Sequence, residues 1–215
     1  MSKIIAPSLL SANFANLSQD ITLLNQSAAT WLHVDVMDGV FVPNISFGFP
    51  VFKAIRSLTD RFLDVHLMIT EPQRYLEAFA KAGADQLTVH WENQWHLHRT
   101  LQQIRLLGKK TGLAINPHTS VAVVREVIGL VDTICLMGVN PGFGGQSLIP
   151  QTWERLDQLA LLTQGTCVKI QIDGGVSAEN AGEFFSRGAE ILVAGQAVFH
   201  TPDILRNIEI LLASQ

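Results

Sequence analysis

The chain has 215 residues, of which 47% are hydrophobic and 16% are charged, and its formal net charge is −4 at pH 7. The hydrophobic fraction is too high for a disordered chain, and the charged fraction is too low for a coiled coil. Without a basic run or an apolar stretch of about 20 residues, neither a nucleic acid nor a membrane is expected as a partner.

Eight short runs rich in β-branched residues recur along the chain, and a helix-like segment follows each of them. The runs cover residues 3–8, 31–37, 62–68, 86–90, 112–116, 132–137, 168–173 and 191–194. Their starts lie about 27 residues apart, the size expected of a strand–helix repeat. Eight such units without a linker predict an α/β fold, a single-domain (β/α)8 TIM barrel over residues 1–215. A doubly wound open sheet is the alternative, but it would leave two strand edges to protect.

Two of the helical segments carry end signals. The periodic segment 72–82 is closed by Gly83, and a second helix is expected to open at Ser177 with a polar cap and to close at Gly188. Both fit the connections that the barrel requires between its strands.

Polar and ionisable residues concentrate at the carboxyl ends of the predicted strands, whereas the strand bodies are Val, Ile and Leu. Function collects at that end of a (β/α)8 barrel. The end residues are Ser8, His33–Met37, His66–Met68, His90, Asn116, Met137, Asp173–Gly175 and Gly195. This bias predicts a functional site at the mouth of the barrel.

The alternation of side chains along a strand places His33 and Asp35 on one face. With His66 and Asp173 they are expected to point inward near the barrel mouth. Two imidazoles and two carboxylates suit Zn²⁺, Fe²⁺, Mn²⁺ or Co²⁺. A single inward histidine is more often a hydrogen-bonded core residue. Two carboxylates inside a barrel are costly, however, unless a cation or protonation offsets their charge.

Further strand-end residues allow two interpretations each. Met37, Met68 and Met137 either fill gaps in the top layer of the barrel or form a cap that excludes water beside the metal. His90 and Glu92 lie on the same face of their segment. They either hold the metal ligands in orientation or simply cap the strand.

Three glycine clusters follow the last three predicted strands: Gly142, Gly144 and Gly145, then Gly174–Gly175, then Gly195. Such loops expose backbone N–H groups that can bind an anion, and the loops after strands 7 and 8 form the usual phosphate site of this barrel. A single glycine pair marks a tight turn more often than a site. Because no Lys or Arg stands in these loops, backbone dipoles would have to hold the phosphate.

Five segments together resemble the ribulose-phosphate 3-epimerase family. They are Ala6–Ala12, His33–Gly39, Asp64–Met68, Val139–Gln146 and Asp173–Gly175. The resemblance spans essentially the whole chain. It implies a (β/α)8 barrel that interconverts D-ribulose 5-phosphate and D-xylulose 5-phosphate in the pentose phosphate pathway and the Calvin cycle.

The resemblance also implies roles for individual residues. His33, Asp35, His66 and Asp173 would bind one divalent ion per subunit, with Zn²⁺ or Fe²⁺ preferred over Mn²⁺ or Co²⁺, and Asp35 and Asp173 would be the acid/base pair. The expected substrate contacts are Ser8, His66, Gly142, Phe143, Gly144, Gly145, Asp173, Gly174, Gly175, Gly195 and Gln196. The substrate is a phosphorylated ketopentose, and the family suggests a homo-oligomer, a dimer or a hexamer.

Two departures from the family pattern bear on substrate size: Gly138 stands where Ser or Thr is common, and Gln196 where Ser or Asn is frequent. The six-carbon allulose 6-phosphate is therefore an alternative substrate. A decarboxylase of the orotidine or keto-gulonate type would resemble an Asp-x-Lys-x-x-Asp motif at the end of the third strand. This alternative is rejected, because the segment 64–69 lacks both the Lys and the second Asp. A non-catalytic sugar-phosphate sensor would not need two opposed carboxylates.

The two cysteines, Cys135 and Cys167, form no CxxC motif. Cys135 lies in an apolar run and is interpreted as a buried reduced thiol. A reducing, cytoplasmic location follows as the expectation.

Overall fold

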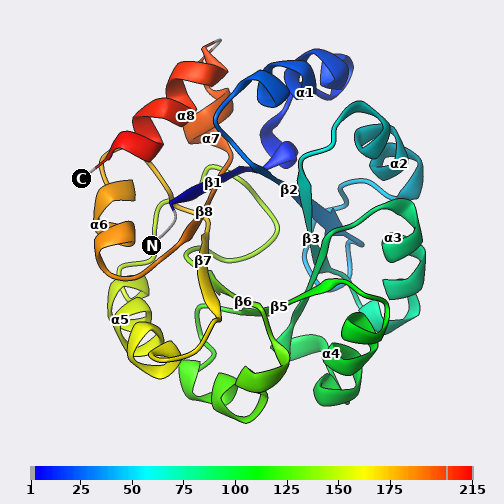
Figure 1. Cartoon of the computed structure of the whole chain (residues 1–215), viewed down its shortest axis with the longest axis vertical. Helices are drawn as coiled ribbons and strands as arrows, with labels where there is room; N and C mark the ends of the chain where they lie inside the picture. Colours follow the sequence, from blue (N-terminus) through cyan, green and yellow to red (C-terminus); the bar gives the residue numbers. More distant parts are fainter. Residues whose placement is uncertain (1–2, 202, 215) are drawn as a thin grey trace.

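A computed structural model describes residues 3–201 and 203–214, so the predicted domain limits at residues 1 and 215 lie outside the described residues. Eight parallel strands form a barrel with helices around it (Figure 1). The strands are β1 (Ile4–Pro7), β2 (Trp31–Met37), β3 (Phe62–Met68), β4 (Gln86–His90), β5 (Lys110–Ile115), β6 (Thr133–Met137), β7 (Lys169–Asp173) and β8 (Ile191–Ala194).

Each strand pairs in parallel with its sequence neighbour from β2 to β8, and β1 pairs with β8. An isolated bridge between Ser8, just after β1, and His33, inside β2, brings the two edges of the sheet together. The predicted (β/α)8 barrel is therefore confirmed, and no open sheet with two free edges remains.

The helices form the outer ring. They are α1 (Leu17–Gln26), α2 (Phe49–Leu58), α3 (Leu76–Ala82), α4 (Leu97–Leu106), α5 (Thr152–Thr163), α6 (Ala181–Ser186), α7 (Gln196–Phe199) and α8 (Ile204–Ala213). Short 3-10 segments are η1 (Leu9–Ser11), η2 (Phe14–Asn16), η3 (Pro72–Arg74), η4 (Trp91–Asn93) and η5 (Val121–Leu130). The segment η5 takes the place of an α-helix between β5 and β6.

The hydrophobic core lies between the outer face of the barrel and the helices. Val34, Val65 and Leu67 point outward from β2 and β3 and are wholly buried there, against helix residues such as Phe52 and Ile55. Each such side chain contributes about 1.5–3 kcal/mol when it leaves water. The opposite faces of the same strands are thus free to carry polar groups into the barrel.

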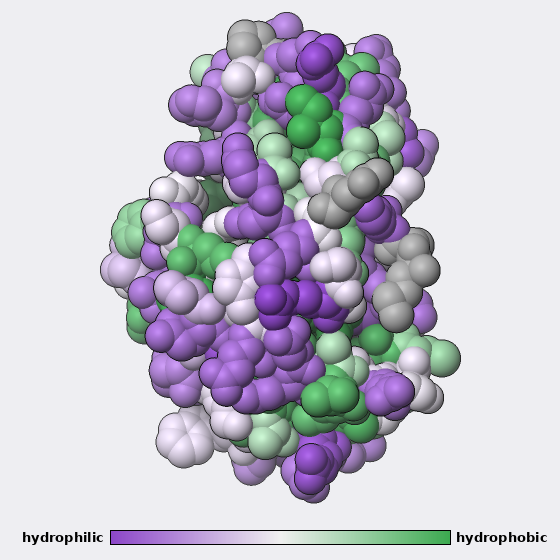
Figure 2. Space-filling view, turned by 90° about the vertical axis from the view of Figure 1, so that its left-hand side faces the viewer, coloured by the Kyte–Doolittle hydropathy of each residue, from purple (hydrophilic) through white to green (hydrophobic). Residues whose placement is uncertain are grey.

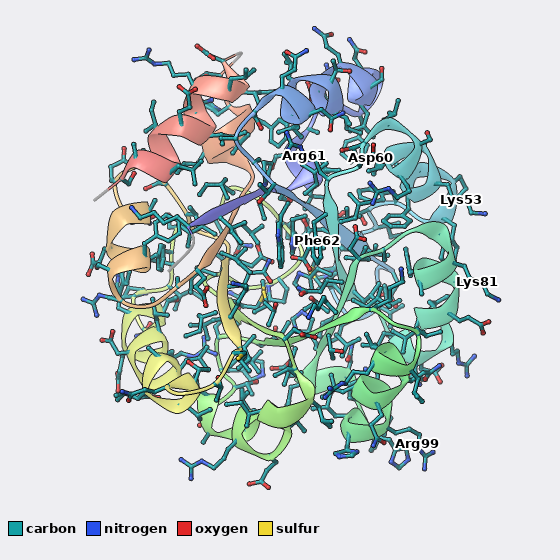
Figure 3. All side chains as sticks on the ribbon, in the orientation of Figure 1. Lys53, Asp60, Arg61, Phe62, Lys81 and Arg99 are labelled. Carbon is teal, nitrogen blue, oxygen red and sulfur yellow. The ribbon has the colours of Figure 1, made fainter. Side chains whose placement is uncertain are left out.

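The charged residues of the helices point away from this core. Lys53, Lys81 and Arg99 extend outward from α2, α3 and α4, whereas Phe62 at the start of β3 lies near the barrel axis (Figure 3). Phe62 stacks on Trp31, with the ring centroids 4.1 Å apart, at the amino end of the strands. These two rings fill the end of the barrel that lies opposite the predicted site.

The surface carries no broad apolar band on the face seen in Figure 2, where hydrophilic residues predominate and hydrophobic ones form small groups. In the described part of the chain, no helix combines the length and the hydrophobicity needed to cross a membrane.

Several element ends differ from the sequence prediction. Ser8 and Asn116 lie just beyond β1 and β5 rather than inside them. The helix expected to open at Ser177 begins only at Ala181. The Asn180 side chain accepts a hydrogen bond from the backbone N–H of Ser177 and donates one to the carbonyl of Gly175, at 2.8 Å each. Because this side chain satisfies the local backbone, the segment 177–180 is a turn.

Candidate functional site

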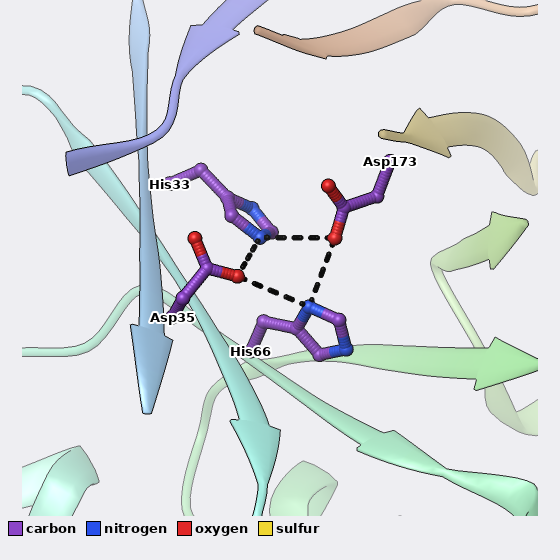
Figure 4. A group of neighbouring side chains, drawn as sticks. All are labelled: His33, Asp35, His66 and Asp173. Atoms are coloured by element: carbon purple, nitrogen blue, oxygen red, sulfur yellow. Dashed lines mark ion pairs between the residues drawn. The ribbon is translucent and has the colours of Figure 1, made fainter. Parts of the chain in front are cut away.

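Four side chains from three strands meet at the carboxyl end of the barrel. His33 and Asp35 come from β2, His66 from β3 and Asp173 from the end of β7 (Figure 4). Each offers one ligand atom, and these atoms all lie within 4.8 Å of one another. His33 Nε2 is 3.2 Å from Asp35 Oδ1, and His66 Nδ1 is 3.2 Å from Asp173 Oδ2. Residues 138 positions apart in the sequence meet because the barrel closes.

The donor set of this group fits a divalent cation. His33 Nε2 and His66 Nδ1 are both buried, and neither has a hydrogen-bond partner. A buried polar atom without a partner is costly, so such an atom calls for an explanation. Two imidazole nitrogens beside two carboxylates match the ligands of Zn²⁺, Fe²⁺ and related ions. The group can therefore hold one metal ion.

Electrostatics links the histidines to the carboxylates. Burial alone would lower the pKa of His33, but Asp35 and Asp64 raise it well above its usual value. Burial would raise the pKa of Asp35, but His33 and His66 hold it well below its usual range. The carboxylate is thus ionised at neutral pH and attracts positive charge to the centre of the group.

Behind His33 lies a second buried carboxylate, Asp64. Its Oδ2 lies 2.8 Å from His33 Nδ1 and accepts a hydrogen bond from Gln171 Nε2 at 2.6 Å. Its Oδ1 accepts from Gln86 Nε2 at 2.9 Å and from Thr88 Oγ1 at 3.3 Å. Burial would raise the pKa of Asp64, but His33 and these donors lower it. The ionised carboxylate accepts the Nδ1 proton of His33, so Nε2 is the nitrogen that faces the cation position.

Sequence reasoning assigned Asp64 no role. A signal was present, since Asp64 stands two residues before His66 and therefore shares its inward face. The side chain lies deeper than the mouth, opposite His33 in the register of β2 and β3.

Behind His66 lies a longer chain of contacts. His66 Nε2 is 2.8 Å from His90 Nε2, and His90 Nδ1 is 3.2 Å from Glu92 Oε2. Glu92 Oε1 accepts hydrogen bonds from the backbone N–H of Asn116 at 2.7 Å and from the hydroxyl of Thr119. This geometry supports the interpretation that His90 and Glu92 orient a ligand over the alternative of a simple strand cap.

Burial and hydrogen bonding act in opposite directions along this chain. Complete burial lowers the pKa of His90 to about 4, although Glu92 opposes the shift. Burial would raise the pKa of Glu92, but hydrogen bonds from His90, Thr119 and Asn116 lower it to about 2. At neutral pH the pair is a neutral imidazole beside a carboxylate.

Two serines hold Asp35 in place. The Ser8 hydroxyl donates to Asp35 Oδ2 at 2.6 Å, so that Oδ1 faces the histidines. The Ser46 hydroxyl donates to the backbone carbonyl of Asp35 at 2.6 Å and accepts from the N–H of Met37. Ser46 lies in the loop after β2, where no sequence pattern distinguished it.

A cavity of about 550 Å³ opens above the four side chains. The predicted site residues that line it are Ser8, Asp35, Met37, Met68, Met137, Gly142, Phe143, Gly144, Gly145, Asp173, Gly174, Gly175, Gly195 and Gln196. His33 and His66 lie beneath it with no exposed surface. Among the described residues that line the cavity there is no Lys or Arg.

The glycine loops close the other side of the cavity. A Cβ on Gly145, whose φ is +76°, would lie 2.3 Å from Gln196 Nε2, so this loop packs directly against the start of α7. The Asn44 side chain donates to the Gly142 carbonyl at 2.8 Å and ties the loop to the opposite rim. A Cβ on Gly138 would lie 2.4 Å from the Gly174 carbonyl oxygen. In this chain the backbone just after β6 therefore lies too close to the backbone just after β7 to leave room for a side chain at position 138.

Comparisons with known proteins agree on one family. Residues 4–199 match the sequence model of the ribulose-phosphate 3 epimerase family. The ribulose-phosphate 3-epimerase of Synechocystis sp. is 48% identical over 209 residues, which are 95% of this chain and 91% of that protein. The ribulose-phosphate 3-epimerase of Bacillus subtilis is 48% identical over 202 residues, 93% of each chain.

Solved structures of lower identity share the fold. A 3-hexulose-6-phosphate synthase has a TM-score of 0.70 at 18% identity and covers 100% of this chain and 99% of its own. The 3-keto-L-gulonate-6-phosphate decarboxylase of Vibrio cholerae has a TM-score of 0.71 at 14% identity, with 98% and 96% covered. At these identities the likeness concerns the barrel alone.

Proposed function

The chain belongs to the ribulose-phosphate 3-epimerase family and interconverts D-ribulose 5-phosphate and D-xylulose 5-phosphate, and we propose that Asp35 and Asp173 are the two groups that move the proton at C3. Epimerisation removes a proton next to the C2 ketone and returns a proton to the opposite face of C3. A single base would tend to restore the original configuration, so two groups on opposite sides are required.

The observation that carries this proposal is the position of the two carboxylates. Asp35 comes from β2 and Asp173 from β7, and both line the cavity while facing the same centre (Figure 4). In one direction the ionised carboxylate takes the C3 proton, and the electron pair moves onto the C2 oxygen as an enediolate. The other carboxyl group then delivers its proton to the opposite face. In the reverse direction the two groups exchange roles.

His33, Asp35, His66 and Asp173 would hold one divalent ion, and Zn²⁺ or Fe²⁺ fits this mixed set of imidazoles and carboxylates well, with Mn²⁺ or Co²⁺ as alternatives. When bound, such an ion supplies positive charge that stabilises negative charge on the sugar oxygens. Ser8 keeps one oxygen of Asp35 away from the centre through its 2.6 Å hydrogen bond, which fixes the direction in which the other oxygen points.

The other predicted residues that line the cavity would enclose the substrate. Met37, Met68 and Met137 contribute apolar surface to the cavity beside the carboxylates and would keep water from the reacting carbon. The backbone N–H groups of the three glycine clusters would bind the phosphate in the absence of Lys or Arg. Closure of the loop 142–146 would retain the enediolate, which could otherwise eliminate phosphate.

We also propose a cytoplasmic homo-oligomer, a dimer or a hexamer. The free thiols of Cys135 and Cys167 support the cytoplasmic location. The exposed Val40 and Ile45 side chains at the barrel mouth support the assembly. Light scattering of the purified protein measures its mass in solution, and a monomer would contradict the assembly.

The test of the reaction is incubation with D-ribulose 5-phosphate in D2O, followed by NMR. We expect D-xylulose 5-phosphate with deuterium at C3, because the returned proton comes from a group that exchanges with solvent. A product that keeps the original hydrogen at C3 would contradict proton transfer between two exchanging carboxyl groups.

A further inference from the structure

Glu92 and His90 lie behind a ligand of the proposed metal site without touching the substrate cavity. We propose that Glu92 is a positioning residue: through His90 it fixes the proton of His66 on Nε2, so that the Nδ1 lone pair points to the metal. The inference rests on the metal site proposed above. It assigns opposite tautomers to the two histidine ligands.

The donor and acceptor roles along the contacts from Glu92 through His90 to His66 follow from the hydrogen bonds that Glu92 accepts. The backbone N–H of Asn116 can only donate, so Glu92 Oε1 must accept there, and the Thr119 hydroxyl donates to the same oxygen. Arg155 donates to the carbonyl oxygens of Asn116 and Thr119, at 2.7 and 3.1 Å, and holds this segment against the barrel. The Glu92 carboxylate is thereby locked with Oε2 toward His90.

The protons of the two imidazoles then have one arrangement. A carboxylate oxygen only accepts, so His90 Nδ1, at 3.2 Å, carries the proton. A neutral imidazole has one N–H, which makes His90 Nε2 an acceptor. The contact of 2.8 Å between the two Nε2 atoms therefore requires the proton to be on His66. His66 Nδ1, which lies 3.6 Å from Asp35 Oδ1 and 3.2 Å from Asp173 Oδ2, is then the nitrogen left to bind the metal.

The other ligand has the opposite arrangement. Asp64 contacts His33 directly at Nδ1, and Nε2 faces the centre. His33 thus binds through Nε2, and its Nδ1 contacts the Asp64 carboxylate directly. His66 binds through Nδ1, and the His90 imidazole lies between it and the Glu92 carboxylate. Each proton is directed away from the metal by a different buried support.

The substitution Glu92→Gln reverses the donor and acceptor roles along the contacts from residue 92 through His90 to His66, because the new amide has only one possible orientation. The Gln oxygen must face the N–H of Asn116, which leaves the amide NH2 toward His90 Nδ1. This NH2 donates, so the His90 proton moves to Nε2 and the His66 proton moves to Nδ1, where it blocks the metal. The matched control is Asp132→Asn, since Asp132 Oδ2 also accepts a backbone N–H, from Thr111 at 2.9 Å, at the other end of the barrel.

The experiment uses the Zn²⁺-loaded protein with ¹⁵N-labelled histidine and a titration of Zn²⁺ against a chromogenic chelator. In the wild type we expect NMR signals for His90 protonated at Nδ1 and His66 protonated at Nε2. Glu92→Gln is expected to raise the Kd for Zn²⁺ about 10- to 100-fold, while Asp132→Asn leaves it unchanged.

Three results would overturn the inference. The first is a wild type whose His90 carries its proton at Nε2, a result that needs no variant to fold. The second is a Glu92→Gln protein that binds Zn²⁺ as tightly as the wild type. The third is a wild type that binds no Zn²⁺, Fe²⁺, Mn²⁺ or Co²⁺. This result would also refute the proposed metal site, whereas the first two refute only the positioning role of Glu92.

Discussion

The two halves of the cavity are built from different parts of the chain. On one side, Asp35 and Asp173 extend from strands whose other side chains are locked in the barrel, and buried groups such as Asp64 support the histidines beneath them. On the other side, glycine loops after β6, β7 and β8 present mainly backbone. The first half offers imidazole and carboxylate side chains, whereas the second offers backbone N–H groups and a shape that a Cβ would fill.

This difference separates the expected effects of substitution. Changes in the side-chain half remove chemistry, so they should lower kcat. Changes in the glycine half alter the shape and closure of the proposed phosphate site, so they should mainly raise KM.

Asp35→Asn is expected to have the largest effect. The loss of one positioned acid/base group costs 10²–10⁴ in rate, and this residue is also a proposed ligand, so we expect kcat to fall about 10⁴-fold. Steady-state kinetics with a coupled assay for xylulose 5-phosphate measures it, with Asp132→Asn as the control of unchanged activity. A kcat within tenfold of the wild type would refute the role of Asp35.

Removal of metal comes next. Because a bound divalent ion contributes several kcal/mol of charge stabilisation, treatment with a strong chelator is expected to lower kcat about 10³-fold. Zn²⁺ or Fe²⁺ should restore the activity. Elemental analysis must accompany the assay, since full activity in verified metal-free protein would contradict the metal site.

Gly145→Ala tests the glycine half. The new Cβ would approach Gln196 Nε2 to 2.3 Å and distort the proposed phosphate loop, so we expect KM to rise about tenfold, equivalent to about 1.4 kcal/mol, with a smaller change in kcat. Gly165→Ala is the matched control, because Gly165 has a φ of +78° but nothing within 4 Å of a new Cβ.

Both glycine variants should lose about 1–2 kcal/mol of stability from the left-handed backbone. Only Gly145→Ala should change KM, which separates crowding of the loop from backbone strain. Equal KM values for the two variants would contradict the assignment of this loop to the phosphate site.

Asn44→Ala is expected to have the smallest effect. It removes the 2.8 Å hydrogen bond to Gly142 that ties the loop across the mouth, worth about 0.5–1.5 kcal/mol, so KM should rise about threefold. Asn25→Ala removes the hydrogen bonds to the Leu58 carbonyl, at 2.8 Å, and from the Thr59 hydroxyl, both far from the cavity, and should leave KM unchanged. A fall in kcat without a rise in KM for Asn44→Ala would contradict the expectation that changes in the glycine half act mainly on KM.

The side-chain half was largely predictable from the sequence. Strand alternation alone puts His33 and Asp35 on one face, and the strand-end rule of the barrel brings His66 and Asp173 to the same mouth. Depth along the barrel was harder to predict, because Asp64 and His66 have the same parity, and only the register of β2 and β3 shows that Asp64 lies beside His33.

The glycine half could be located but not built from the sequence. Glycine clusters mark loops that can bind an anion, yet the contact from Asn44 to Gly142 joins residues 98 apart, and no local pattern announces it. The start of the helix after β7 was predicted too early for a related reason. The Asn180 side chain competes for the backbone there, and capping preferences of single residues do not decide between a turn and a first helical turn.

The most direct test of the two-carboxylate mechanism is the exchange of the C3 hydrogen with D2O in Asp173→Asn, followed by NMR from each sugar phosphate separately. With Asp35 intact and Asp173 unable to accept a proton, we expect exchange to persist from one epimer and to disappear from the other, while phosphate binding is retained. Undiminished exchange from both epimers, or unchanged turnover, would contradict the assignment of Asp35 and Asp173 to opposite faces of the sugar.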